Sequence, residues 1–283
     1  MLVGRLCRAV LLRPAPHAAA QAHAHRAKVG GQGRVRGSEG REKAGRAESS
    51  RAAGRQDAPV AALHGANQEA DGCTAHRAAA VMEVEVKLRL ANAAAHGKLA
   101  AALAADAVGG CKAVHQQENY FFDGSGQELS SKRVVLRVRF YNTDAKALIT
   151  VKGKQVLQDG IGRAPEEEEA TDPAAARAFL SEPCKLLNLG TPLLEGLKRS
   201  TGVEELVCLG GFNNTRQEYE WGGHLLELDE TKFEWGTVYE LECESTEPER
   251  LRRELEAYLT KLGVDYKYST TTKFANFRNR TLE

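Results

Sequence analysis

Charged residues occupy every second position in several short segments of this sequence, where they alternate with apolar residues. Such alternation is typical of β-strands, and it places all the charged side chains of a segment on the same face. The sign of the charge is sorted by segment, because one segment carries both signs, two are cationic and one is anionic. The charged positions are Glu83, Glu85, Lys87 and Arg89 in the mixed segment, Arg137, Arg139, Lys152 and Lys154 in the cationic pair, and Glu240, Glu242 and Glu244 in the anionic one.

This sorting of charge predicts a site that binds an anion together with a cation. Like charges two residues apart on one face repel each other, so each such strand needs counter-ions or an oppositely charged neighbour. Carboxylates clustered without His or Cys suit Mg²⁺ or Mn²⁺, whereas clustered Arg and Lys suit phosphate oxygens. For a single strand, a face solvated by water explains the charges equally well. For the whole set, a polyphosphate with a bound divalent metal satisfies both signs at once.

The charged segments belong to a longer series of expected strands and helices. Apolar residues recurring every three or four positions, together with cap signals, predict helices over 91–107, from 172 onward and over 248–262. The segment 155–169, which contains an uninterrupted acidic run, is predicted to be a loop. The expected strands are 83–90, 119–122, 135–140, 148–154, 214–221, 225–230, 238–244 and 269–277, with Gly222-Gly223 as a hairpin turn.

These elements predict an α+β fold, an antiparallel closed β-barrel with helices packed outside. The helices can cover the apolar outer faces of the strands, so the charged faces point into the barrel. Small barrels ordinarily fill their interior with packed side chains, and a charged interior therefore requires solvent and a ligand. The sequence contains neither G-x-x-x-x-G-K-[ST] nor a G-x-G-x-x-G between a strand and a helix, and nothing resembles a Ser/His/Asp arrangement.

Residues 1–81 differ in composition from the rest of the chain. They carry 13 Lys and Arg against 6 Asp and Glu, a net charge of +7; because the whole chain carries +1, residues 82–283 carry −6. A segment of Ala, Arg, Gly and His cannot bury enough apolar surface to fold, so a disordered basic extension is predicted. Its Arg-rich, acid-poor start suits a transit peptide. However, Met1 and Met82 are the only methionines, which favours upstream sequence ahead of a functional domain at 82–283.

The remaining composition narrows the compartment and the partners. The six cysteines show no C-x-x-C pair, so a reducing compartment such as the cytoplasm fits best, with organelle import as the alternative if 1–81 is a transit peptide. No apolar run approaches the roughly 20 residues that cross a bilayer. A specific nucleic-acid partner is disfavoured because 82–283 is acidic and its basic faces should point inward. We therefore expect a monomer without a membrane partner.

The segment 83–87 has the form E-x-E-x-K, and this form at the start of a domain resembles the signature of the CYTH superfamily, the triphosphate tunnel metalloenzymes. The resemblance covers nearly all of 82–283 and is greatest to the land-plant branch of tripolyphosphatases. The motif alone is weakly specific, but further elements follow in the family's order. They are 136–139, the segment around Lys152, 210–216, 227–232, 239–244 and 272–274.

The resemblance implies an eight-stranded antiparallel barrel, open at both ends, that binds a triphosphate at its centre with Mg²⁺ or Mn²⁺. It would place Glu220 and Asp229 in the acidic half, whereas Glu230 and Glu240 are equally well explained as ion-pair partners. By position, Lys87, Arg137, Arg139, Lys152, Arg216 and Lys273 would bind phosphate oxygens, Glu83, Glu85, Glu242 and Glu244 would hold the metal, and Glu83, Glu242 and Lys87 would act in catalysis.

The implied function is divalent-metal-dependent hydrolysis of a triphosphate to diphosphate and phosphate. We expect water to attack the terminal phosphorus in line with the departing diphosphate, with catalysis by positioning and charge neutralisation. Inorganic tripolyphosphate is the favoured substrate, because no aromatic pair flanks a charged strand where a base could stack. The alternatives are a non-catalytic polyphosphate-binding module, and a hydrolase or cyclase acting on thiamine triphosphate or ATP.

Overall fold

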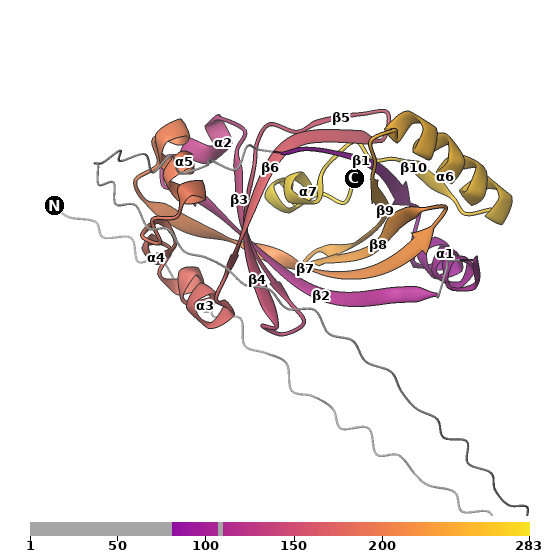
Figure 1. The fold of residues 1–283 in the computed structure, drawn as a ribbon, viewed down its shortest axis with the longest axis horizontal. Helices are drawn as coiled ribbons and strands as arrows, with labels where there is room; N and C mark the ends of the chain where they lie inside the picture. The colour runs from indigo at the N-terminus through magenta and orange to yellow at the C-terminus, as the bar shows by residue number, and fades with distance from the viewer. Residues whose placement is uncertain (1–80, 107–109) are drawn as a thin grey trace, which may run out of the picture. The chain divides into compact units, whose positions relative to one another are not determined.

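The computed structural model describes residues 81–106 and 110–283, so the extension predicted at the start of the chain lies outside the described residues up to position 80. Within these ranges the chain forms ten strands and seven helices (Figure 1). The strands are β1 Val81–Leu90, β2 Cys111–Gly124, β3 Val135–Tyr141, β4 Lys146–Lys152, β5 Val156–Gln158, β6 Ile161–Thr171, β7 Leu206–Trp221, β8 His224–Phe233, β9 Gly236–Glu244 and β10 Tyr266–Tyr268. The helices are α1 Ala93–Asp106, α2 Glu128–Ser131, α3 Pro173–Ser181, α4 Cys184–Leu187, α5 Pro192–Thr201, α6 Pro248–Leu262 and α7 Lys273–Asn279.

Eight of the strands form a closed barrel. Their order around it is β1-β9-β8-β7-β2-β3-β4-β6, and the pairing of β6 with β1 completes the ring (Figure 1). All neighbours in the ring are antiparallel. The short strands β5 and β10 pair with parts of β6 and β1. The eight-stranded antiparallel barrel predicted from the sequence is therefore confirmed.

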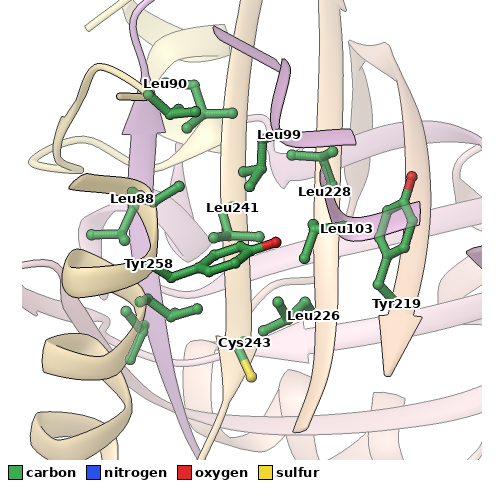
Figure 2. Packing of buried hydrophobic residues seen from close by; sticks show 14 of the residues in the cluster. Leu88, Leu90, Leu99, Leu103, Tyr219, Leu226, Leu228, Leu241, Cys243 and Tyr258 are labelled. Atoms are coloured by element: carbon green, nitrogen blue, oxygen red, sulfur yellow. The ribbon is translucent and has the colours of Figure 1, made fainter. Parts of the chain in front are cut away.

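Alternation along the strands separates an apolar outer face from a polar inner face. Leu88 of β1, Leu228 of β8 and Leu241 of β9 point outward and are fully buried beneath α1 and α6 (Figure 2). A second apolar cluster buries the outer faces of β3 and β4 with residues of α3, α4 and α5. Removing these faces from water stabilises the barrel from outside. The inner face is consequently free to carry charge.

The three helices predicted from the sequence are present. α3 begins after Asp172, whose carboxylate accepts a hydrogen bond from the backbone N–H of Ala175 at 2.7 Å. α6 ends at Gly263, whose φ of 59° is the left-handed conformation expected of a helix stop. α5 was missed although Thr191 and Pro192 form the same start signal as in α3. None of the helices in the described ranges is long and apolar enough to span a membrane.

The prediction of a loop over 155–169 is wrong, because most of that segment belongs to strand β6. This strand pairs with β1 on one side and with β4 on the other. Consecutive acidic residues conceal the alternation: Glu166 and Glu168 line the barrel interior, and Glu167 lies between them on the opposite face. Lys152 of β4 lies opposite Glu166 and contacts its carboxylate at 2.8 Å. The neighbouring strands thus supply the counter-charge that lets this acidic segment pair as a strand.

The prediction of a strand over 269–277 is also wrong, because helix α7 occupies most of that segment. Thr272 caps the helix, its hydroxyl accepting a hydrogen bond from a backbone N–H of the first turn at 3.0 Å. Phe274 and Phe277 pack against Phe121 of β2, with ring centroids 4.7 and 5.5 Å apart. Figure 1 shows α7 within the ring of strands. One end of the barrel is therefore partly filled by an aromatic cluster, whereas the resemblance implied two open ends.

Candidate active site

The barrel encloses a cavity of about 630 Å³. Every residue predicted to bind phosphate or metal lines this cavity, although these residues come from five different strands and from α7. Their shared location is thereby established, while their individual roles remain predictions. The residues brought together are Lys87, Arg137, Arg139, Lys152, Arg216 and Lys273 on the cationic side, and Glu83, Glu85, Glu242 and Glu244 on the acidic side.

Two arginines of β3 line one side of the cavity, and only Arg137 is paired with carboxylates. Arg139 donates to neutral groups, the side-chain oxygen of Asn119 at 2.7 Å and the hydroxyl of Tyr141 at 3.2 Å. Burial and the nearby charge of Arg139 lower the pKa of Arg137. One nitrogen of Arg137, Nη2, contacts Glu168 at 3.2 Å and Glu166 at 3.4 Å and donates to the hydroxyl of Thr150 at 3.0 Å, whereas its Nε is buried without a hydrogen-bond partner among the described residues. The positive charge of these two buried arginines is only partly neutralised by carboxylates, so binding of an anion is favoured. Their planar guanidinium donors match the geometry of phosphate oxygens.

Glu242 connects three of the predicted phosphate ligands at the centre of the cavity. Its carboxylate accepts hydrogen bonds from Lys87 at 2.7 Å and from Arg216 at 2.9 Å, and it also contacts Lys273. Burial disfavours its charge, but Lys273, Lys87 and Arg216 together hold the pKa of Glu242 well below its usual range. Glu242 is therefore ionised and already neutralised, and it keeps three cationic side chains close together.

The register of β1 against β9 shows where positive charge is missing. Lys87 lies opposite Glu242, but Glu85 lies opposite a second carboxylate, Glu244. Burial and the negative charges of Glu85 and Glu166 raise the pKa of Glu244. Like charges directly opposite each other on paired strands are destabilising. Glu85 already contacts Lys87 at 2.9 Å, whereas Glu244 has no ion-pair partner among the described residues, so a cation bound beside Glu244 would be favourable.

Glu83 stands beside that carboxylate pair and is hydrogen-bonded to Glu166 of β6. Burial, the hydrogen bond to Glu166 and the charge of Glu85 raise the pKa of Glu83 to about 8. Burial opposes the charge of Glu166 as well, but Glu83, Arg137 and Lys152 lower its pKa to about 2. The two carboxyl groups thus titrate as a pair and hold one proton between them near neutral pH.

The acidic end of the cavity fits a hard divalent cation by the chemistry of its donors. Carboxylate oxygens without His or Cys are what Mg²⁺ and Mn²⁺ prefer. Here Lys152 lies near Glu83, Glu85, Glu166 and Glu244. Lys87 also contacts Glu85 at 2.9 Å, and Arg137 contacts Glu166 at 3.4 Å, so four carboxylates face three cationic side chains. Among the described residues, no three acidic, His or Cys side chains already surround a common point. Metal binding therefore requires these carboxylates to reorient and to release the shared proton.

The sequence assigned no role to Glu227, whereas it placed the neighbouring Asp229 in the acidic half. Glu227 of β8 lines the cavity and contacts Arg216, and burial raises its pKa to about 7. Two residues further along β8, Asp229 is fully buried and contacts both Arg216 and Lys273 at 2.7 Å. The period-two alternation of 225–230 already put both carboxylates on one face, so the same signal could have identified Glu227.

Two residues that the sequence suggested for the charged interior lie elsewhere. Glu220 is half-exposed at the end of β7 and pairs with Lys112 at 3.0 Å. Lys154 lies beyond the end of β4 and is exposed. Glu230 and Glu240 form ion pairs, with Lys232 at 3.2 Å and with Arg89 at 3.3 Å respectively. Strand alternation continues past the barrel wall, so alternation alone does not say where the interior ends.

The fold and the site define the class of this domain, a closed antiparallel barrel whose interior carries the six cationic side chains of the site and a facing set of carboxylates. The chain belongs to the CYTH domain family, whose family model matches residues 82–275. The resemblance inferred from the sequence motifs is thereby confirmed.

Comparison with solved structures gives the same result. A protein of the plant Hippeastrum, named as an adenylyl cyclase and described by a dominant triphosphatase activity, is 39% identical, with a TM-score of 0.68 over 71% of this chain and 97% of that one. A protein named as an adenylate cyclase from Bacillus halodurans is 19% identical, with a TM-score of 0.53 over 69% and 98% of the two chains. The second likeness concerns the fold alone. The comparison with curated proteins found no match.

Proposed function

We propose that residues 82–283 hydrolyse inorganic tripolyphosphate to diphosphate and phosphate with the help of Mg²⁺ or Mn²⁺. The observation that supports this proposal is the cavity of about 630 Å³, which is lined by the six Lys and Arg side chains named above and by carboxylates of β1, β6 and β9. The triphosphatase activity described for the Hippeastrum relative supports the same reaction class. A polyphosphate with a divalent metal neutralises both groups of charge, whereas either ligand alone neutralises only one.

The cationic residues of this chain bind and orient the substrate. Arg137 and Arg139 offer donors that carboxylates of the protein leave partly unused, so they can take phosphate oxygens directly. Lys87, Arg216 and Lys273 are held together around Glu242, which places their charges in advance of substrate binding. Phosphoryl transfer depends mainly on positioning and charge neutralisation, and a prearranged set of cations supplies both.

The carboxylates at the acidic end would hold the metal, and one of them would accept a proton from water. Glu83, Glu85 and Glu244 of the acidic end and Glu242 from the centre of the cavity are the proposed ligands, and Glu242 would have to exchange a contact with Lys87, Arg216 or Lys273 for the metal. A bound divalent metal would lower the pKa of water and neutralise phosphate charge. The carboxyl pair of Glu83 and Glu166 already carries one proton near neutral pH. Once deprotonated, an oxygen of this pair can accept a proton from the attacking water. Glu83 is thus the proposed base.

The aromatic residues of the cavity favour an inorganic substrate. Phe121, Phe212 and Phe274 pack against one another, with centroid distances of 4.7 and 5.4 Å to the ring of Phe121. Each of these rings therefore already packs against another aromatic ring of the protein. ATP and thiamine triphosphate remain the organic alternatives. The described cysteines are free, which agrees with the proposed location in a reducing compartment such as the cytoplasm.

Phosphate release from tripolyphosphate, ATP and thiamine triphosphate, with Mg²⁺ or with EDTA, tests this function. We expect fastest release from tripolyphosphate, no release in EDTA, and loss of turnover in Glu83→Gln. Glu254→Gln, an exposed change on α6, is the matched control and should keep full activity. Tight tripolyphosphate binding without any phosphate release would instead identify a binding module. Full activity of Glu83→Gln would contradict the assignment of the acidic end.

A further inference from the structure

A buried ion pair lies behind the phosphate-binding cations, outside the residues that line the cavity. Arg89 of β1 is 4% exposed and Glu240 of β9 is 1% exposed, and they lie opposite each other in the β1–β9 register at 3.3 Å. Among the described residues, none of the three guanidinium nitrogens of Arg89 has a hydrogen-bond partner. A buried ion pair with unsatisfied donors gives little net stability, because desolvation costs as much as the attraction returns. A contribution to stability therefore does not explain why this ion pair is present.

The two oxygens of Glu240 face different partners. Oε1 is the oxygen nearest Arg89, and it accepts a hydrogen bond from the hydroxyl of buried Ser269 at 2.8 Å. Oε2 faces the ammonium of Lys273 at 3.3 Å. Arg89 and Ser269 therefore hold Glu240 from one side while its other oxygen lies at the edge of contact with a proposed phosphate ligand.

Lys273 lies among three carboxylates, so its position depends on their competition. Its ammonium lies 2.7 Å from Asp229, in close contact with Glu242, and farther from Glu240. An ammonium drawn onto Glu240 would move away from Glu242, which faces the cavity. The charge of Arg89 weakens the pull of Glu240 on Lys273, because one carboxylate then serves two cations.

We propose that Arg89 is a positioning residue, which occupies Glu240 so that Lys273 stays directed at the triphosphate. This inference rests on the proposed role of Lys273 in substrate binding. It assigns Arg89, Glu240 and Ser269 to substrate affinity through Lys273, although none of the three lines the cavity. Loss of Arg89 leaves Glu240 without its counter-ion, and Lys273 then pairs with Glu240 at the expense of the substrate.

Arg89→Gln tests this relation in the full chain. We expect the Kd for tripolyphosphate, measured by calorimetry in EDTA, and the KM in Mg²⁺ to rise about tenfold, while kcat changes less than threefold. In a Lys273→Gln background, adding Arg89→Gln should cause no further rise, because the two changes act through the same group. Arg250→Gln on α6, an exposed arginine, is the control and should behave like the unchanged protein.

Two outcomes would overturn the proposal. One is an unchanged Kd and KM in folded Arg89→Gln, and the other is an equal loss of affinity with and without Lys273. If Arg89→Gln does not fold, the double variant Arg89→Gln with Glu240→Gln removes both buried charges and should bind tripolyphosphate within about threefold of the unchanged protein. A tenfold loss in that folded double variant also contradicts it. The calorimetric Kd needs no turnover, so absence of hydrolysis would count against the proposed function alone.

Discussion

At the scale of single residues, the site consists of charges that neutralise each other until a ligand replaces one side. Glu242 holds Lys87, Arg216 and Lys273 together, and its low pKa reflects those three cations, which outweigh the cost of burial. Arg137 shows the reverse condition, because burial and a second arginine lower its pKa. Glu242 therefore organises the cations at the centre of the site, and Arg137 keeps hydrogen-bond donors that can bind an anion.

Replacing Arg137 with glutamine should weaken substrate binding with little effect on the fold. A hydrogen bond to a charged group contributes about 1.5–3 kcal/mol, so we expect KM for tripolyphosphate to rise roughly 10- to 100-fold. Initial-rate kinetics measure the change. Lys112→Gln removes a cation from an exposed ion pair outside the cavity and serves as the control. Equal effects of the two substitutions would contradict the assignment of Arg137 to phosphate.

The proton held by Glu83 predicts how stability depends on pH. Its folded-state pKa of about 8 lies above its ordinary value, so the folded protein binds more protons than the unfolded chain between about pH 4.5 and 8. The contribution of Glu83 to the free energy of unfolding is therefore present below this range and is lost as the pH rises through it. Denaturant unfolding in EDTA should show this decline, and Glu83→Gln should flatten it.

Magnesium provides the second half of that experiment. Because a bound metal competes with the proton on Glu83, stabilisation by Mg²⁺ should increase as the pH rises towards 8. The same denaturant series with Mg²⁺ measures the increase. A stabilisation by Mg²⁺ that is constant from pH 6 to 8.5 would show that the proton and the metal do not share this site.

At the scale of elements, the helices outside the barrel allow the strands to keep a charged inner face. α6 buries Leu251, Leu255 and Leu259 against the outer faces of β1 and its neighbours, while its exposed face carries ion pairs such as Arg250 with Glu254. The stability of this region therefore comes from outside the cavity. Changes in this packing and changes in the site should affect different measurements.

Leu255→Ala should destabilise the domain without changing the site. Leu255 is fully buried between α6 and the barrel, and such a truncation typically costs about 2–5 kcal/mol through lost transfer energy and a residual cavity. Denaturant unfolding gives the loss, and KM at low temperature should stay unchanged. Arg250→Ala on the exposed face of α6 should cost less than about 0.5 kcal/mol. A large change in KM would place this helix in contact with the site.

At the scale of the whole molecule, closure of the barrel brings together the charges of β1, β3, β4, β6 and β9. In the absence of ligand these charges pair with one another, as Lys152 does with Glu166 at 2.8 Å. A metal alone must displace cations from carboxylates, and an anion alone must displace carboxylates from cations. When both ligands bind, the metal takes the carboxylates and the anion takes the cations, so every displaced side chain gains a new partner. The closed barrel therefore couples the binding of the metal to the binding of the anion.

Binding of Mg²⁺ and of diphosphate, the proposed product, should therefore be cooperative. A ligand at 100 times its Kd stabilises the folded state by about 2.7 kcal/mol, which a thermal melt detects. We expect the shift in Tm with both ligands to exceed the sum of the two separate shifts. Glu244→Gln should reduce the excess, whereas Glu254→Gln should leave it. Additive shifts in the unchanged protein would argue against adjoining metal and phosphate sites.

Much of the fold and of the candidate site followed from local pattern. Period-two alternation located most barrel strands, and helix caps such as Asp172 and Gly263 located two of the helices. The two errors have different origins. Alternation is hidden where both faces are acidic, as in β6, whereas 269–277 shows no alternation: Phe274 and Phe277 are three residues apart, which is the spacing of helix α7. In both segments the structure depends on contacts with distant strands.

The sequence by itself determined which residues carry charge and which of them share a strand face, because both are properties of the local chain. It could not determine which strand lies beside which. The tertiary structure decided that Lys87 meets Glu242 while Glu85 meets Glu244, and that Lys273 enters the cavity from a helix. Those strand pairings decide which charged side chains have an oppositely charged neighbour and which do not. Electrostatic interaction depends on distance, and these distances are set only when the barrel closes.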